Sequence, residues 1–171
     1  MRPLLFLLFL AALPATAQHD HQRHYAAYAD DADRAIKALS SQETTGLLEG
    51  RGLGLAMAAE LNRYPGPLHV LELADSLGLS PEQHAEAQRL FDGVQAEARP
   101  LGAQIVEMER HLDALFAGGA ATPEDVARIT SHLGEARGRL RAVHLSAHIA
   151  MRNALTPNQT AAYDRLRGYT N

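Results

Sequence analysis

The sequence predicts an all-α protein built on a long antiparallel helical hairpin with additional shorter helices, four to five helices in all. Apolar side chains recur every three or four positions over two long stretches, which is typical of amphipathic helices. Three Ser-Pro or Thr-Pro pairs precede helical patterns, and no alternating strand pattern competes with them. Hydrophobic residues make up 46% of the 171 positions, which is enough to bury the core of one domain.

Composition and charge exclude several classes of function. The chain carries 16 basic and 20 acidic residues, and its net charge of -4 argues against nucleic-acid binding and against an anionic membrane surface. The absence of cysteine excludes thiol catalysis, Cys-zinc sites, iron–sulfur clusters and c-type haem attachment. Histidine, with 9 copies, is the polar residue type that stands out.

Residues 1–17 are predicted to be a signal peptide. Arg2 supplies a positive start, residues 4–13 form an apolar run, and Ala15-Thr16-Ala17 matches the small-x-small cleavage pattern. We therefore expect cleavage near Ala17, export to the periplasm and no membrane span in the mature chain, because no other stretch is apolar enough. An uncleaved membrane anchor is the alternative.

The mature chain is expected to divide into a His-rich flexible segment, residues 18–39, and a single helical domain, residues 40–171. The segment has no apolar period and carries His19, His21 and His24 close together. Short tracts of this kind are typical of metal-binding peptides. A solvated N-terminus with chance histidines is the other interpretation.

The first helices of the domain are short. Ser40 or Ser41 is expected to cap the first, with Glu43 near its third position. The sequence Tyr-Pro-Gly-Pro then breaks the pattern, because proline cannot continue a helix. A short helix is predicted over residues 68–77, ended by Gly78.

The next start is the clearest in the chain. Ser80 is predicted at the N-cap, Pro81 at the first helical position and Gln83 at the third, which together form a capping box. Pro100 is expected to kink the long helix without ending it, since the apolar period continues beyond it. The apolar stripe of this helix consists of Leu90, Val94, Ala98, Leu101, Ile105, Met108, Leu112 and Leu115.

A second long helix is predicted to fold back on the first. Two glycines at 118–119 end the first helix, and Thr122-Pro123 starts the second after a short turn, as in an antiparallel hairpin. Thr156-Pro157 then opens a last short helix. The stripe of the second long helix consists of Val126, Ile129, Leu133, Ala136, Leu140, Val143, Ala147, Ala150 and Ala154.

The pentapeptides Leu79-Ser80-Pro81-Glu82-Gln83 and Leu155-Thr156-Pro157-Asn158-Gln159 resemble the two Leu-Thr-x-x-Gln motifs of the periplasmic Spy/CpxP superfamily. This superfamily includes the zinc-associated ZraP-like proteins and the CnrX-like heavy-metal sensors. The resemblance covers roughly residues 68–170, with serine for threonine at position 80. It implies a small helical protein, often a dimer, without enzymatic chemistry, and leaves open whether the role is chaperoning, metal binding or signalling.

His144 and His148 are one turn apart on the second long helix, and Met151 continues the same line. Two imidazoles so spaced suit one divalent transition metal such as nickel, cobalt, zinc or copper, and a thioether adds a soft ligand. In CnrX-like proteins a His and a Met four apart join ligands from the N-terminal part. His144 corresponds to that His, whereas His148 stands where the Met would be, so the metal preference stays open. Two surface histidines are the alternative.

Two histidines do not complete a metal site, so further ligands are needed. The His-rich segment near the N-terminus, which we call the tail, is the candidate source. His19, His21 and His24 could fold over the hairpin and close the coordination shell. The first hypothesis is therefore an exported, non-enzymatic, metal-responsive protein with no organic cofactor, which signals to an envelope protein or assists resistance. The alternative is an ATP-independent chaperone that cradles unfolded clients, although the acidic charge differs from the basic cradle expected of Spy-like proteins.

Overall fold

The computed structural model describes Tyr28 and residues 31–169, and its helices belong to one compact unit that begins at Asp33. The described part contains no β-strand, so the predicted all-α fold is confirmed. Three of its helices have only one or two turns, more short helices than the pattern predicted. In order, the helices are α2 (Ser41–Leu48), α3 (Met57–Glu60), α4 (Pro67–Glu72), α5 (Ala74–Leu77), α6 (Pro81–Ala117), α7 (Pro123–Ala154) and α8 (Pro157–Leu166).

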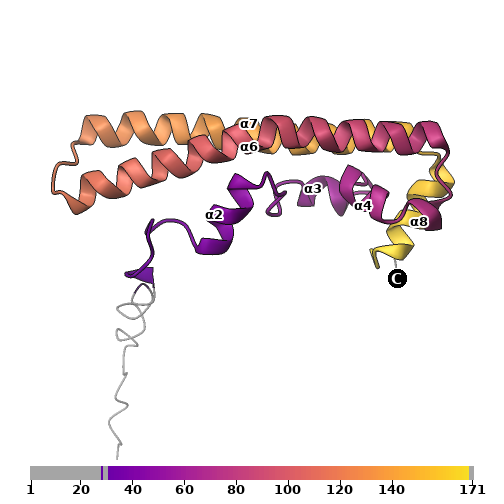
Figure 1. Cartoon of the computed structure of the whole chain (residues 1–171), viewed down its shortest axis with the longest axis horizontal. Helices are drawn as coiled ribbons and strands as arrows, with labels where there is room; N and C mark the ends of the chain where they lie inside the picture. The colour runs from indigo at the N-terminus through magenta and orange to yellow at the C-terminus, as the bar shows by residue number, and fades with distance from the viewer. Residues whose placement is uncertain (1–27, 29–30, 170–171) are drawn as a thin grey trace, which may run out of the picture. The chain divides into compact units, whose positions relative to one another are not determined.

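The two long helices α6 and α7 lie side by side as an antiparallel hairpin, with the shorter helices on one side of it (Figure 1). The turn between them contains Gly119 at a φ of 65°, a left-handed conformation that glycine adopts without a steric penalty. α6 continues through Pro100 as one helix of 37 residues. The hairpin predicted from the spacing of apolar residues is therefore present.

The short helix predicted over residues 68–77 is divided in two. α4 ends at Glu72 and α5 begins at Ala74, because Leu73 leaves helical geometry at φ -105° and ψ 15°. Gly78 closes α5 in the left-handed conformation, in the role that the sequence indicated.

An aliphatic cluster fills the hairpin on the side of α2. α2 approaches α6 very closely, since a Cβ atom built on Gly102 would lie 1.9 Å from the carbonyl oxygen of Leu47. The absence of a side chain at Gly102 is what allows this packing. The buried members of the aliphatic cluster are Ile36, Leu39, Leu47, Ala98, Leu101, Ile105, Val106, Ile129, Leu133, Ala136 and Leu140.

A second cluster lies at the other end of the hairpin, where α4, α5 and α8 pack. Its buried members are Val70, Leu77, Ala87, Met151, Leu155 and Tyr163. We refer to it as the cap-end cluster, because the helix starts at Ser80 and Thr156 border it. The two clusters contain different residues along α6 and α7, so the short helices at each end are anchored independently.

The helix starts at Ser80 and Thr156 are capping boxes that are joined to each other. The hydroxyl of Ser80 accepts from the backbone N–H of Gln83, and that of Thr156 accepts from the N–H of Gln159. Nε2 of Gln83 donates to Oε1 of Gln159 at 2.9 Å, and Nε2 of Gln159 donates back at 2.8 Å. The two amides therefore link the start of α6 to the start of α8.

The predicted signal peptide and the tail histidines His19, His21 and His24 lie outside the described residues. Within the described part, no helix has an apolar stretch of membrane-spanning length.

Candidate functional site

A cavity of about 870 Å³ opens between the segment of residues 49–69 and the hairpin. α7 contributes His144 and His148 to its lining, so the structure brings two of the residues singled out from the sequence to one site. α3 contributes Glu60, and α4 contributes His69. Pockets of this size are typical of sites for small ligands.

His144 is buried, with 7% of its surface exposed. Its Nε2 atom forms no hydrogen bond with any described residue. Burial lowers the pKa of His144 below its usual range, and the neighbouring His148 lowers it further. The imidazole is therefore kept neutral, which is the form that binds metal ions.

His148 is held in one orientation by the backbone. Its Nδ1 atom lies 2.7 Å from the carbonyl oxygen of Tyr64, and since a carbonyl only accepts, Nδ1 carries the proton. The lone pair is then on Nε2. A ring N–H donated to a backbone carbonyl is the arrangement that orients metal-ligating histidines. The Nε2 edge lies against Gly66, where a Cβ atom would stand 2.9 Å from it.

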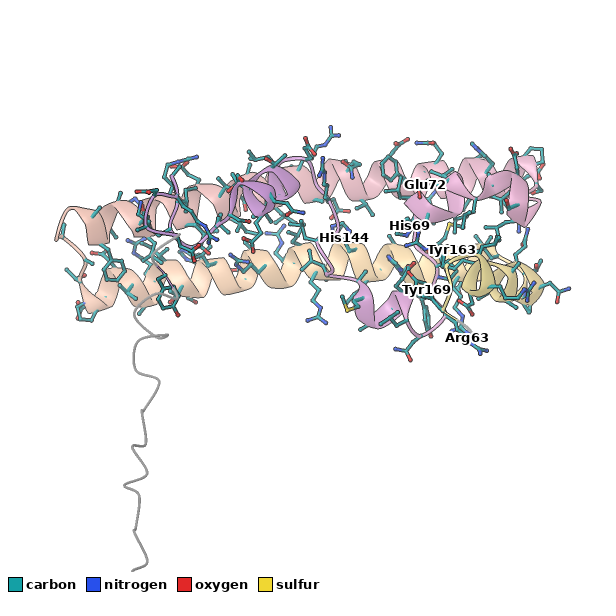
Figure 2. All side chains as sticks on the ribbon, turned by 90° about the horizontal axis from the view of Figure 1, so that it is seen from below. Arg63, His69, Glu72, His144, Tyr163 and Tyr169 are labelled. Carbon is teal, nitrogen blue, oxygen red and sulfur yellow. The ribbon has the colours of Figure 1, made fainter. Side chains whose placement is uncertain are left out.

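Glu60 is the centre of a polar network at the cavity. Tyr163 and Tyr169 donate to its Oε1 atom, the latter at 3.1 Å. His69 Nδ1 and Arg167 Nε lie 3.4 Å and 3.5 Å from the same oxygen. Figure 2 shows His69, Tyr163 and Tyr169 close together beside α8, with His144 further along α7. We call Glu60 and these four neighbours the Glu60 network.

The network keeps Glu60 ionised. Burial alone would raise the pKa of this carboxyl group, but its interactions with His69, Tyr163 and Tyr169 outweigh that effect and lower the pKa to about 2. Burial and the carboxylate together raise the pKa of Tyr163. The other carboxylate oxygen, Oε2, is buried without a hydrogen bond to any described residue, and lies 3.6 Å from His148 Nδ1.

The loop after α3 fixes Glu60 against the hairpin. The guanidinium of Arg152 stacks over the ring of Tyr64, 4.3 Å from its centroid. Arg63 adopts a left-handed φ of 65°, and its Nε lies 3.5 Å from the buried Asp164. These contacts, together with the bond from His148 to Tyr64, attach the loop to both α7 and α8. This attachment holds Glu60 in position at the cavity.

Met151 and the remaining histidines lie elsewhere. Met151 is fully buried in the cap-end cluster and does not line the cavity. His84, His111 and His132 are exposed on the long helices. No group of three or more His, Cys, Asp or Glu side chains within residues 31–169 is arranged to hold a metal ion. His144 and His148 thus offer two nitrogens that need further ligands.

No pattern in the sequence indicates the Glu60 network. Its members come from α3, α4, α8 and the residues directly after α8, and are separated by up to 109 positions, so no local spacing relates them. One signal was present: Tyr163 and Tyr169 lie in the apolar pattern of the last helix, and a buried tyrosine hydroxyl needs a partner. Glu60, the charged residue that follows two alanines in α3, is that partner.

Comparison with known proteins gives one match. The model of a family described as heavy-metal resistance matches residues 52–162. These residues include α3 to α7 and most of α8, and therefore His144, His148 and Glu60. Searches of curated proteins and of solved structures return no significant match.

Proposed function

Because the chain belongs to the heavy-metal resistance family of the Spy/CpxP/CnrX-like superfamily, we propose that it is an exported, non-enzymatic protein that binds a divalent transition metal at His144 and His148. Membership confirms the superfamily that the motifs at Leu79 and Leu155 resemble. A metal-responsive or accessory role in resistance follows from such binding. Nickel, cobalt, zinc and copper are the candidate ions, since imidazole nitrogens suit all four.

One observation carries the proposal: two neighbouring imidazoles line the same cavity, each with a ring nitrogen that no described residue hydrogen-bonds. On His144 this atom is Nε2, which is buried. On His148 it is the Nε2 atom opposite the bond to Tyr64. A bound cation would stabilise both nitrogens, and the ionised Glu60 nearby makes the cavity more favourable for positive charge.

The remaining ligands are proposed to come from the histidines near the N-terminus, His19, His21 and His24. Tight binding of transition metals requires three or four protein ligands, and the cavity provides two imidazoles. Deleting residues 18–24 should then weaken binding at least tenfold while the melting temperature of the metal-free protein is unchanged. Equal affinity after the deletion would place the missing ligands elsewhere.

Calorimetric titration with the four ions tests the site. We expect a Kd below about 10 μM for at least one of them, which corresponds to about -7 kcal/mol. The double variant His144→Ala, His148→Ala should lose this binding. The matched control His84→Ala, His111→Ala removes two exposed histidines and should retain it. If both double variants bind equally, the metal is held by scattered histidines and not by the cavity.

The affinity should also depend on pH in a defined direction. A metal ion and a proton compete for the same imidazole nitrogen, and free histidine titrates near pH 6.5. Binding is therefore expected to weaken as the pH falls below about 6. A Kd that stays constant from pH 7 to pH 5 would contradict ligation by histidine.

Export is part of the proposal and rests on the N-terminal sequence. Mass spectrometry of the protein from the cell envelope should find an N-terminus at or beside Gln18, because Ala15-Thr16-Ala17 is the cleavage pattern. An intact Met1 in the membrane fraction would favour an anchor instead.

A chaperone role is the second candidate, and exposed apolar side chains favour it. Met57 and Leu61 are 60% and 58% exposed, and Leu53 and Leu68 also reach solvent beside them. Surfaces of this kind contact unfolded clients. Suppression of aggregation of an unfolded protein, independent of metal and unaffected by the double variant at His144 and His148, would put this role first.

A further inference from the structure

The cavity has properties that a metal site alone does not need. Leu53, Met57, Leu61 and Leu68 line it and expose between 42% and 60% of their surface to water. They account for four of the nine large apolar side chains that the described part leaves exposed. Phe91 and Val94 of α6 continue the apolar lining inward. An apolar ligand would remove this concentrated surface from water.

The floor of the cavity is polar and lacks partners at defined atoms. Glu60 is 9% exposed, and its Oε2 atom forms no hydrogen bond with any described residue. His144, 7% exposed, likewise leaves Nε2 without a partner. Arg167, which also lines the cavity, leaves its Nε atom without a hydrogen bond to any described residue. Buried polar atoms are nearly always hydrogen-bonded, so two acceptors and one donor without partners on residues that line one cavity point to a polar group of a ligand.

The charges at the floor determine which polar group fits. Glu60 is an anion and its Oε2 atom can only accept, so the ligand must present a donor. Arg167 lies on the side of the other oxygen, Oε1, and donates to Tyr169. An ammonium group makes a charge-assisted hydrogen bond to a carboxylate, roughly twice as strong as that of a neutral hydroxyl. A carboxylate ligand would instead meet Glu60 with like charge.

Two arginines at the rim of the cavity have partners, but only the one paired with a carboxylate has its charge offset. Arg51 pairs with Glu49 at 2.5 Å, and Arg99 donates to Gln95 at 3.0 Å. We propose that this cavity binds an amphiphilic amine, whose apolar body packs against Leu61, Met57 and Phe91 and whose ammonium group donates to Oε2 of Glu60. This is a binding function distinct from metal binding, and it does not depend on the proposed tail ligands.

The test is calorimetry on the full chain, with a metal chelator present so that the result is separate from the metal proposal. Three probes share an eight-carbon chain and differ in the headgroup: octylamine, 1-octanol and octanoate, all below their micellar concentrations at pH 7. Octylamine should bind at least tenfold more tightly than 1-octanol, and octanoate should bind most weakly. Equal affinity of octylamine and octanoate, or binding of neither, would overturn the proposal.

Two variants separate the headgroup from the apolar body. Glu60→Gln should weaken octylamine binding at least tenfold and change 1-octanol binding less than threefold. Leu61→Ser should weaken both, whereas Phe116→Ser, which changes an equally exposed side chain outside this cavity, should weaken neither. Identical behaviour of Leu61→Ser and Phe116→Ser would contradict the assigned cavity even if Glu60→Gln fails to fold.

An unfolded protein client is the competing occupant, and the same variants distinguish it. A client would contact the exposed apolar rim without needing the buried Oε2 atom, so Glu60→Gln would leave client binding unchanged. Client binding by a protein that takes up no octylamine would overturn the proposal in favour of a chaperone surface.

Discussion

Two buried glutamates, one near each end of the hairpin, are held in different ways. Glu109, 8% exposed, lies on α6 beside the aliphatic cluster and accepts from Arg137 of α7 at 2.7 Å. Arg137 keeps 48% of its side chain in solvent. Glu60, 9% exposed, is surrounded by His69, Tyr163 and further groups from three parts of the chain. The contact of Glu109 requires only that two helices face each other. The contacts of Glu60 require that several segments of the chain come together.

This difference separates a structural half from a functional half. We call the part around the aliphatic cluster the aliphatic half, and the part around Glu60, His144 and His148 the cavity half. The aliphatic half satisfies its buried carboxylate with one long, partly solvated side chain. The cavity half leaves Glu60 Oε2 and His144 Nε2 unpartnered, which lowers stability but provides groups for a ligand.

The largest expected effect is in the aliphatic half. Gly102→Ala would place a methyl group 1.9 Å from the carbonyl oxygen of Leu47, and backbone cannot move aside as a flexible side chain can. We expect a loss of about 3 kcal/mol through displacement of α2 from α6. Urea denaturation would measure the change.

Gly93→Ala is the matched control on the same helix, since a Cβ atom there meets nothing within 4 Å. It should stabilise the protein by about 0.5–1 kcal/mol, because alanine has the higher helix propensity. Equal effects of the two substitutions would mean that α2 does not pack on Gly102.

The second effect concerns the pH dependence of the cavity half. The pKa of Glu60 is lowered to about 2, so the unfolded chain takes up the proton first as the pH falls below about 4.5. The stability that this carboxylate contributes is present above pH 4.5 and is lost progressively towards pH 2. Glu60→Gln should therefore cost about 2 kcal/mol at pH 7 and flatten the acid limb of the stability curve.

Glu109→Gln is the corresponding change in the aliphatic half. Its partner Arg137 is half exposed and can be solvated when the carboxylate is removed, so the loss at pH 7 should stay below about 1 kcal/mol. Chemical denaturation of both variants from pH 7 to pH 2 compares them directly. A larger loss for Glu109→Gln than for Glu60→Gln would reverse the assignment of the two halves.

The aliphatic half could be predicted from sequence because its information is local. Steps of three and four placed Ala98, Leu101 and Ile105 on one face of a helix, and the glycines at 118–119 marked the fold-back. The tight approach at Gly102 could not be predicted, since it depends on where α2 docks. Each capping motif could be predicted from its own residues, but the hydrogen bonds between Gln83 and Gln159 could not, since they join positions 76 apart in the sequence.

The cavity half was predicted only where one helix carries the pattern. His144 and His148 were found because they are four apart, and their membership in one cavity follows from the docking of residues 49–69 on the hairpin. Glu60 and His69 join them through contacts with Tyr163 of α8, which is 103 and 94 positions away from them in the sequence. The break at Leu73 and the burial of Met151 likewise depend on packing at the cap-end cluster, which periodicity does not specify.

The third effect tests the helix starts in the two halves. Thr156→Ala removes the hydroxyl that accepts from the backbone N–H of Gln159. The free energy of unfolding should fall by about 1 kcal/mol, seen as fraying of α8. Ser40→Ala should cost a similar amount at α2, since Ser40 caps Glu43 in the same way. Thermal denaturation followed by circular dichroism measures both. Unchanged melting of Thr156→Ala would show that its hydroxyl does not stabilise the start of α8.

The smallest expected effect tests whether the two capping motifs act as one unit. The side-chain amides of Gln83 and Gln159 donate to each other. The loss of stability on replacing Gln159 should therefore be smaller when Gln83 has already been replaced. A double-mutant cycle with Gln83→Ala and Gln159→Ala should give a coupling of about 1 kcal/mol. The cycle of Ser40→Ala with Gln159→Ala, whose residues share no contact, should be additive within about 0.3 kcal/mol. Additivity in both cycles would mean that the starts of α6 and α8 are stabilised separately, and that the cap-end cluster alone joins these helices.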